Sequence, residues 1–344
     1  MLKMICLTAA IIGFVAGAFA GPVKVGAIRW DAWVGAPNTV GATVEKTLGP
    51  SQYHYRVPFY GMETGTNSIQ ARATTQAVMD QEIVYAKTAG LNYWAFLWYP
   101  PASGLDIARK LYLSSTHVHD INFCLIIEVN NFPTNITPAQ IVSFMSMTNY
   151  QKVLGNRPIL YFLGYAGIKK SDVDSIRAGA ERAGLGKPYI VMMRTDSNLG
   201  ILGPLGLDAF SMYATSWVGG GAPYSLLAST DIGQWDWIKS QGYKIVPNVT
   251  AGWDKRPRAD NPVSWDHDPG NYNTQWVIMP TPTELANHVQ DAITWVRKNP
   301  AAADAGTALI YSWNEFDEGG WICPTLTNYD GTARLDAIKR VLVR

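Results

Sequence analysis

The segment Thr307 to Gly319, TALIYSWNEFDEG, places two glutamates directly after a short apolar run. The run from Thr307 to Ser312 predicts a buried β-strand, because it is short and apolar and is followed by polar residues rather than by a helical pattern. Glu315 and Glu318 then lie three residues apart at the C-terminal end of that strand. Two carboxyl groups held close together cannot both ionise at their ordinary pKa values, so one keeps a proton while the other stays charged. The segment therefore predicts a paired acid and base.

Other short apolar runs precede this strand and alternate with amphipathic segments. Together with TALIY they give eight predicted strands: VKVGAI, LNYWAFLWY, INFCLIIE, PILYFL, PYIVMM, DAFSMYA, KIVPNV and TALIY. Helical patterns fill the intervals, as from Thr281 to Lys298, and capping signals predict further helix starts at Thr137 and Ser171. This alternation over residues 21–344 predicts an α/β protein, a single-domain (β/α)8 TIM barrel that carries the catalytic site. A doubly wound open sheet is the alternative, but the first run leads into RWDAW rather than a glycine-rich phosphate loop.

Residues 1–20 have the pattern of a secretory signal peptide, with Lys3, an apolar stretch from Met4 to Val15, and small residues before Gly21. We therefore expect a secreted or periplasmic protein. No later apolar run reaches about 18 residues, so we expect no membrane contact after signal removal. The chain has 28 basic residues, one of them Lys3, against 27 acidic ones. This even balance argues against nucleic acid as a partner. No feature of the sequence indicates the oligomeric state.

Cysteine and histidine patterns predict neither a metal site nor a cofactor. Cys124 lies in the apolar run NFCLIIE and is expected to pack inside a strand. The sequence does not decide whether Cys124 and Cys323 form a disulfide. His117 and His119 form an HxH pair just before the third strand, at the rim opposite the two glutamates. The sequence has no phosphate loop and no nucleophile elbow motif. The predicted chemistry therefore depends on side chains alone.

Active sites of (β/α)8 barrels lie where the strands end, so the residues past each apolar run are the candidate substrate contacts. Many of them are acidic or aromatic, as expected for an oligo- or polysaccharide substrate, although an aromatic residue there can instead close the barrel by packing. The candidates are Asp31, Trp98, Tyr99, Glu128, Arg194, Tyr213, Trp217, Trp253, Asp254, Arg258 and Asn314, around the catalytic Glu315 and Glu318. A polar insertion from Arg256 to Thr274, which contains Trp265, Asp266 and His267, is long enough to cover a substrate.

Two motifs carry a resemblance to a known family. GWDKRPR at Gly252 to Arg258 and WNEFDEG at Trp313 to Gly319 resemble the GWDNTPR and WNEWxEG signatures of the endo-α-1,2-mannosidase family, glycoside hydrolase family 99, and its WbsX-like relatives. Their order and their positions at two strand ends also agree with that family. Over the rest of the chain, the resemblance is limited to the barrel layout. It implies a glycoside hydrolase that cleaves an α-linked glycan with net retention.

The resemblance also implies roles for individual residues. Glu315 is the base that assists attack by the substrate's own 2-hydroxyl, and Glu318 is the general acid and base, with a 1,2-anhydro sugar between the two steps. Asp254 and Arg258 match the first motif and either orient the substrate or brace the loop. An ordinary double displacement with Glu128 as nucleophile is the competing mechanism.

Departures from the family pattern leave the sugar specificity open. Phe316 stands where the family usually has Trp, Asp317 where the mannosidases have His, and Cys323 where WbsX-like members often have Glu. Two other functional classes stay open. A glycosyltransferase of WbsX type is disfavoured by the export signal and the lack of a diphosphate-binding motif. A non-catalytic sugar-binding barrel has no need for two adjacent carboxylates.

Overall fold

The computed structural model describes residues 21–194, 198–266 and 269–343, so the predicted signal peptide lies outside the described residues. Within these ranges, eight parallel strands follow one another around a single sheet in chain order. They are β1 (Lys24–Arg29), β4 (Tyr93–Leu97), β5 (Asn122–Glu128), β7 (Arg157–Leu163), β8 (Tyr189–Arg194), β9 (Ala209–Met212), β10 (Asn248–Thr250) and β11 (Thr307–Tyr311). Each overlaps one of the apolar runs of the sequence. The predicted (β/α)8 barrel is therefore confirmed.

Hydrogen bonds close this sheet into a ring. β1 pairs in parallel with both β4 and β11, which joins the two ends of the chain. β9 meets the residues just before β10 through a parallel bridge between Phe210 and Ile245, where the amide of Val246 donates to the Phe210 carbonyl at 2.8 Å. Because the strands are parallel, their C-terminal ends all reach the same rim.

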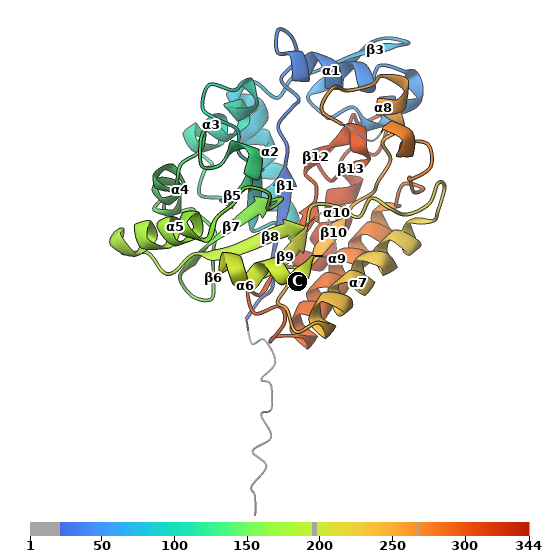
Figure 1. Ribbon diagram of the computed structural model, residues 1–344. Helices are drawn as coiled ribbons and strands as arrows, with labels where there is room; N and C mark the ends of the chain where they lie inside the picture. Colours follow the sequence, from blue (N-terminus) through green and yellow to red (C-terminus); the bar gives the residue numbers. More distant parts are fainter. Residues whose placement is uncertain (1–20, 195–197, 267–268, 344) are drawn as a thin grey trace, which may run out of the picture.

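Helices cover the outside of the barrel (Figure 1). The helices that alternate with the barrel strands are α2 (Gln76–Ala89), α3 (Ile107–Ser114), α4 (Pro138–Met145), α5 (Lys170–Arg182), α7 (Tyr224–Ser240), α9 (Pro282–Lys298) and α10 (Ala333–Leu342). Capping boxes at Thr137 and Thr281 start α4 and α9 as predicted. The predicted start of α5 at Ser171 is slightly late, because Asp172 accepts the backbone amide of Lys169 and fixes the helix start there.

Aromatic side chains fill the barrel interior near its N-terminal end. The Tyr93 hydroxyl lies 3.1 Å from the Tyr161 hydroxyl and 3.0 Å from the Thr307 side-chain oxygen, so three strands meet at one buried ring. Gly26 stands opposite Tyr93, and a Cβ at this position would lie 2.4 Å from the ring. The first strand therefore needs glycine there, because the Tyr93 ring already occupies the space that a side chain would take.

Shorter elements gather over the C-terminal rim. They are α1 (Thr39–Thr47), the hairpin β2 (Gly61–Gly65) and β3 (Ser68–Ala71), α8 (Arg256–Asp260), and the hairpin β12 (Asn314–Glu315) and β13 (Gly320–Trp321). Figure 1 shows α1, β3 and α8 together at the end of the barrel toward which β12 and β13 project. Two further short elements, β6 (Lys152–Val153) and α6 (Leu202–Leu205), do not belong to this group. The elements over the C-terminal rim roof that end of the barrel and leave a cavity beneath them.

Cys124 and Cys323 are both free and buried, so no disulfide joins them. His117 pairs through Nδ1 with Asp120 Oδ2 at 3.0 Å. Within the ranges that the structure describes, no cluster of three or more His, Cys, Asp or Glu side chains could hold a metal. Among the helices of the same ranges, none combines the length and apolar content needed to cross a bilayer.

Candidate active site

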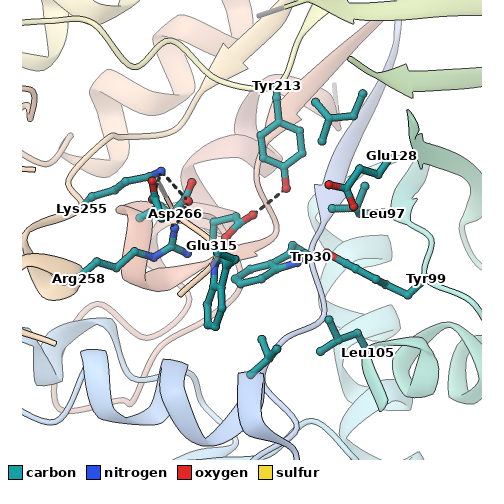
Figure 2. A pocket seen from close by; sticks show the side chains of 14 residues that line it. Trp30, Leu97, Tyr99, Leu105, Glu128, Tyr213, Lys255, Arg258, Asp266 and Glu315 are labelled. Carbon is teal, nitrogen blue, oxygen red and sulfur yellow. Dashed lines mark hydrogen bonds and ion pairs between the residues drawn. The ribbon is translucent and has the colours of Figure 1, made fainter. Parts of the chain in front are cut away.

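A cavity of about 650 Å³ opens at the C-terminal rim of the barrel (Figure 2). Its volume falls in the range of roughly 300–1,000 Å³ that is typical of ligand sites. The lining combines acids, bases, aromatic rings and aliphatic side chains: Trp30, Val40, Leu97, Tyr99, Leu105, Glu128, Leu163, Tyr213, Lys255, Arg258, Trp265, Asp266, Glu315 and Glu318. Both predicted catalytic glutamates therefore face the same space.

The WNEFDEG segment folds as a tight hairpin that presents these glutamates. Glu315 pairs with Gly320 across β12 and β13, and a single 3-10 turn from Phe316 to Glu318 connects the two short strands. The side-chain oxygen of Ser312 accepts the amide of Glu315 at 2.8 Å and fixes the entry into the hairpin. Gly319 has a φ of 83°, and a Cβ there would lie 2.6 Å from the amide nitrogen of Asp254. The motif ends in glycine because no side chain fits at this turn.

Glu318 has partners on both carboxylate oxygens. Oε1 accepts from Arg258 Nη1 and lies 3.1 Å from Lys255 Nζ, while Oε2 accepts the hydroxyl of Tyr311. Burial opposes ionisation of this carboxyl, but the charges of Arg258 and Lys255 outweigh it and hold the pKa of Glu318 below its ordinary value. Glu318 is therefore an anion in the ligand-free site.

Glu315 has a different environment. Tyr213 donates its hydroxyl to Oε1 at 2.7 Å, and Oε2 has no hydrogen-bond partner among the described residues. Burial, reinforced by the charge of Glu318, raises the pKa of Glu315 well above its ordinary value. The pair therefore separates into a protonated Glu315 and a charged Glu318. The sequence predicts such a separation, but the resemblance puts the base at Glu315, which holds the proton here.

The two cations at Glu318 are themselves held by acidic side chains. Arg258 donates to Asp317 at 2.8 Å and to Asp266 at 3.2 Å, and Lys255 lies 2.6 Å from Asp266. These acids come from the hairpin and from the polar insertion predicted to cover the substrate, of which residue 267 lies outside the described residues. The insertion thus contributes Trp265 and Asp266 to the cavity wall.

Asp254 lies behind the cavity and braces this loop. It is fully buried, accepts from Arg56, and takes two further bonds from Arg256, at 2.8 and 2.9 Å. Its own amide donates to the carbonyl of Glu318 at 2.6 Å. Of the two roles left open by the sequence, bracing the loop agrees with this position, since Asp254 does not line the cavity.

Tyr99, Glu128 and Tyr213 line the cavity with the catalytic pair, as does Arg258, whereas other candidates lie elsewhere. Asp31 and Asn314 are buried and line no part of the cavity, and Asn314 Nδ2 donates to Asp31 Oδ1 at 3.0 Å. Trp253 lines an adjoining cavity. The Arg194 side chain lies outside the described residues.

The structure does not bring Trp98 and Trp217 to the cavity. Trp98 is only 2% exposed and packs edge-on against Phe144 of α4. Side chains alternate along an extended chain, so Leu97 and Tyr99 point into the cavity while Trp98 points out to the helices. Trp217 is 46% exposed in the loop after β9 and lines no part of the cavity. Trp98 and Trp217 were predicted as substrate contacts because they follow strand ends, but a position after a strand does not fix the direction in which the side chain points.

Sequence reasoning missed Trp30, Lys255 and Tyr311. Trp30 follows β1, lines the cavity, and donates its indole N–H to the Tyr99 hydroxyl at 2.8 Å. Lys255 stands inside the quoted GWDKRPR motif, next to the candidate Asp254. Tyr311 is the last residue of β11. Trp30 and Lys255 are next to the candidates Asp31 and Asp254, and this adjacency was the signal that could have identified them. Tyr311 belongs to an apolar strand, and no sequence signal distinguishes it there.

Comparison with known proteins agrees with this architecture. No protein-family model matches the chain, and no curated protein matches its sequence. A solved structure of the family 99 endo-α-mannosidase from Bacteroides thetaiotaomicron in complex with BIS-TRIS-propane is similar, with a TM-score of 0.57 and 15% identity over 93% of this chain and 95% of that one. A second structure of that enzyme gives a TM-score of 0.54 and 13% identity over 93% and 96%. This chain shares their fold. These solved structures belong to the family whose signatures the two motifs of this chain resemble.

Proposed function

We propose that this protein is an exported glycoside hydrolase that cleaves an α-linked glycan or polysaccharide with retention of configuration. One observation carries the proposal: Glu315 and Glu318 face one rim cavity, and their surroundings divide them into a protonated and a charged carboxyl group. Glycoside hydrolysis needs such a division, because the leaving oxygen must receive a proton while a second carboxylate assists attack at the anomeric carbon. Residues 1–20 direct export in this proposal.

Glu315 acts as the base and Glu318 as the acid in the proposed first step. Glu315 takes the proton of the substrate's 2-hydroxyl, O2 attacks the anomeric carbon, and Glu318 gives a proton to the departing oxygen. In the second step Glu318 removes a proton from water, water attacks the anomeric carbon, and Glu315 returns its proton to O2. Two inversions at one carbon give net retention. A hydroxyl already fixed on the ring needs only deprotonation, so no enzyme nucleophile is required.

This order of reaction steps requires that substrate binding move the proton from Glu315 to Glu318. A 2-hydroxyl that donates to Glu315 Oε2 stabilises the charged form of Glu315, since hydrogen bonding to a carboxylate lowers its pKa. A glycosidic oxygen can only accept, so it favours the protonated form of Glu318. The two carboxyls interact strongly and titrate as a pair, so both bonds shift one shared proton in the same direction.

The remaining polar lining serves as hydroxyl contacts in this proposal. Glu128 lines the side of the cavity opposite Lys255, as Figure 2 shows, and accepts from Asn131 Nδ2 at 3.3 Å. Tyr99 lies beside it and holds the indole N–H of Trp30. Acidic and phenolic groups next to an indole face are the usual contacts of a sugar ring. Glu128 is also the nucleophile of the competing double displacement, which a stable glycosyl–enzyme ester at this residue would reveal.

The proposal is tested with a panel of α-mannans, α-glucans and other plant and microbial polysaccharides. We expect the wild-type protein to release reducing ends from at least one of them. Proton NMR of the first product should show the α-anomer before mutarotation, as retention requires. Release of the β-anomer would contradict the mechanism, and binding without release of reducing ends would favour the non-catalytic barrel.

Tyr213→Phe should shift the pH dependence of hydrolysis. The Tyr213 hydroxyl donates to Glu315 and stabilises its charged form, so its loss raises the pKa of Glu315 further. In the active form Glu315 is ionised and Glu318 carries the one proton that the pair shares, so a higher pKa of Glu315 makes this form rarer. We expect kcat/KM to fall about tenfold at the plateau and its descending limb against pH to move to higher pH. An unshifted profile would mean that the Tyr213 hydroxyl does not control Glu315.

A further inference from the structure

The cavity that holds the glutamate pair has one aliphatic wall. Four of its lining residues are leucine or valine, and they come from four separate elements: Val40 of α1, Leu97 at the end of β4, Leu105 in the turn from Gly104 to Asp106, and Leu163 at the end of β7. Leu97 and Leu105 are buried, and Val40 and Leu163 are half-buried. We call these four side chains the aliphatic wall. It can neither donate a hydrogen bond to a sugar hydroxyl nor accept one.

The rest of the lining holds few neutral hydrogen-bonding groups. Among the described residues that line the cavity there is no Ser, Thr, Asn, Gln or His. The two phenol groups already have partners, since Tyr99 accepts from the indole of Trp30 and Tyr213 donates to Glu315. Hydroxyl and amide side chains both donate and accept, as sugar hydroxyls do. A ring with hydroxyl groups on every side would therefore leave some of them unpaired in this cavity.

Glu128 interrupts the aliphatic wall. It ends β5, which lies between β4 and β7 in the sheet, and its register partner on β7 is Leu163. Leu97, the last residue of β4, lies beside Glu128 in Figure 2. One hydrogen-bond acceptor therefore stands between two leucines. This arrangement fits a ring hydroxyl that neighbours an apolar substituent.

The aliphatic wall faces the sugar that is attacked. Figure 2 shows Lys255 on one side of Glu315, and Leu97 and Leu105 on the other. Glu315 contacts the 2-hydroxyl of that sugar in the proposed function, so the ring lies between Glu315 and the wall. We infer that this sugar is a 6-deoxyhexose, whose C5 methyl packs against the wall while the neighbouring C4 hydroxyl donates to Glu128. The inference rests on the proposed function and adds to it the chemical class of the sugar.

One oxygen atom decides the preference. An ordinary hexose carries a hydroxymethyl group on C5 where a 6-deoxyhexose carries a methyl. Burying that hydroxyl against the aliphatic wall removes its bonds to water and supplies no protein partner, which costs free energy. A methyl group gains free energy from the same burial. An apolar site rejects a single added hydroxyl by up to about a hundredfold, so we expect kcat/KM to favour the 6-deoxy sugar by about ten- to a hundredfold.

The test uses matched pairs of α-linked oligosaccharides that differ only at C6. The pairs are 6-deoxymannose with mannose, 6-deoxygalactose with galactose, and 6-deoxyglucose with glucose, each in the D and the L series. The measured quantity is the ratio of kcat/KM for the 6-deoxy member to kcat/KM for its hexose partner. We expect a ratio of about ten or more in the configuration that the wild-type protein hydrolyses. A ratio of one or less would overturn the inference and leave the proposed function standing.

Leu105→Asn tests the aliphatic wall itself. The amide has nearly the size of the leucine side chain and gives the hexose hydroxyl a partner, so we expect the ratio to fall by about tenfold. Leu226→Asn is the matched control, because Leu226 is 49% exposed on α7 and lines no part of the cavity. We expect it to keep the wild-type ratio. A folded Leu105→Asn protein with an unchanged ratio would overturn the inference.

Should Leu105→Asn fail to fold, Val40→Thr decides. Threonine has the shape of valine, and Val40 is half-buried on α1, so the change adds a hydroxyl to the wall without altering its packing. We expect the ratio to fall by about threefold, and no change would overturn the inference. A wild-type protein inactive on every pair and on the polysaccharide panel would overturn the proposed function and this inference with it.

Discussion

Glu318→Gln should lower kcat/KM on the polysaccharide by about a thousandfold, within the range of general acid–base catalysis. The amide cannot give a proton to the leaving oxygen, although it keeps the size of the side chain. Fluoride departs without protonation, so the same variant should lose far less activity on the α-fluoride of the released product. The measurement is the pair of kcat/KM values, one for each substrate.

Glu315→Gln provides the opposite pattern, because a base that activates the 2-hydroxyl is needed for both substrates. We expect it to lose activity on the polysaccharide and the fluoride alike. Glu181→Gln is the matched control, since Glu181 is exposed on α5, far from the cavity lining. Rescue of Glu315→Gln rather than Glu318→Gln by the fluoride would reverse the two roles. The reversed roles would agree with the proton that Glu315 holds in the ligand-free site.

Arg258→Met should destabilise the fold and impair catalysis together. Arg258 is 2% exposed and contacts Glu318, Asp317 and Asp266. Its loss leaves Asp317, which is fully buried, without its ion-pair partner. Removing one partner of a buried ion pair costs about 3–5 kcal/mol, and we expect a loss of this size in the free energy of unfolding at neutral pH. Urea denaturation followed by circular dichroism measures it.

The same variant has a pH signature. The folded-state pKa of Glu318 lies below its ordinary value of 4.5, so its contribution to stability is present above that pH and is lost as the pH falls through the folded value. The difference in stability between wild type and Arg258→Met should therefore narrow in acid. Arg256→Met is the control, because its side chain is 35% exposed and Asp254 keeps Arg56 as a partner. A cost equal to that of Arg258→Met would contradict this account of the buried cluster.

The barrel could be predicted from the sequence because each strand is a short apolar run bounded by polar residues. The glutamate pair could be predicted because both members lie in one segment directly after a strand. The β2–β3 hairpin could not, since β2 is mostly exposed and shows no apolar alternation. The prediction that Trp98 faces the cavity was wrong because the sequence does not show which way its side chain points. One residue of difference along an extended chain reverses the direction of a side chain, and the strand end alone does not fix that parity.

The surroundings of the glutamates depend on contacts between distant segments. Arg258 and Glu318 are 60 positions apart, and Arg56 reaches Asp254 across 198 positions. No local pattern encodes which of these charges meet, so the sequence could not say which glutamate holds the proton. The Lys255–Asp266 ion pair is similar, because it depends on how the polar insertion folds back over the rim.

Release of reducing ends by wild type, Glu315→Gln and Glu318→Gln, assayed side by side on the α-polysaccharide panel, tests the central claim most directly. We predict that the wild-type protein hydrolyses at least one polysaccharide and that each single substitution removes about 99% of that activity or more. Hydrolysis that survives in both variants would contradict the account, because the chemistry would then lie outside the carboxylate pair, with Glu128 as the next side chain to substitute.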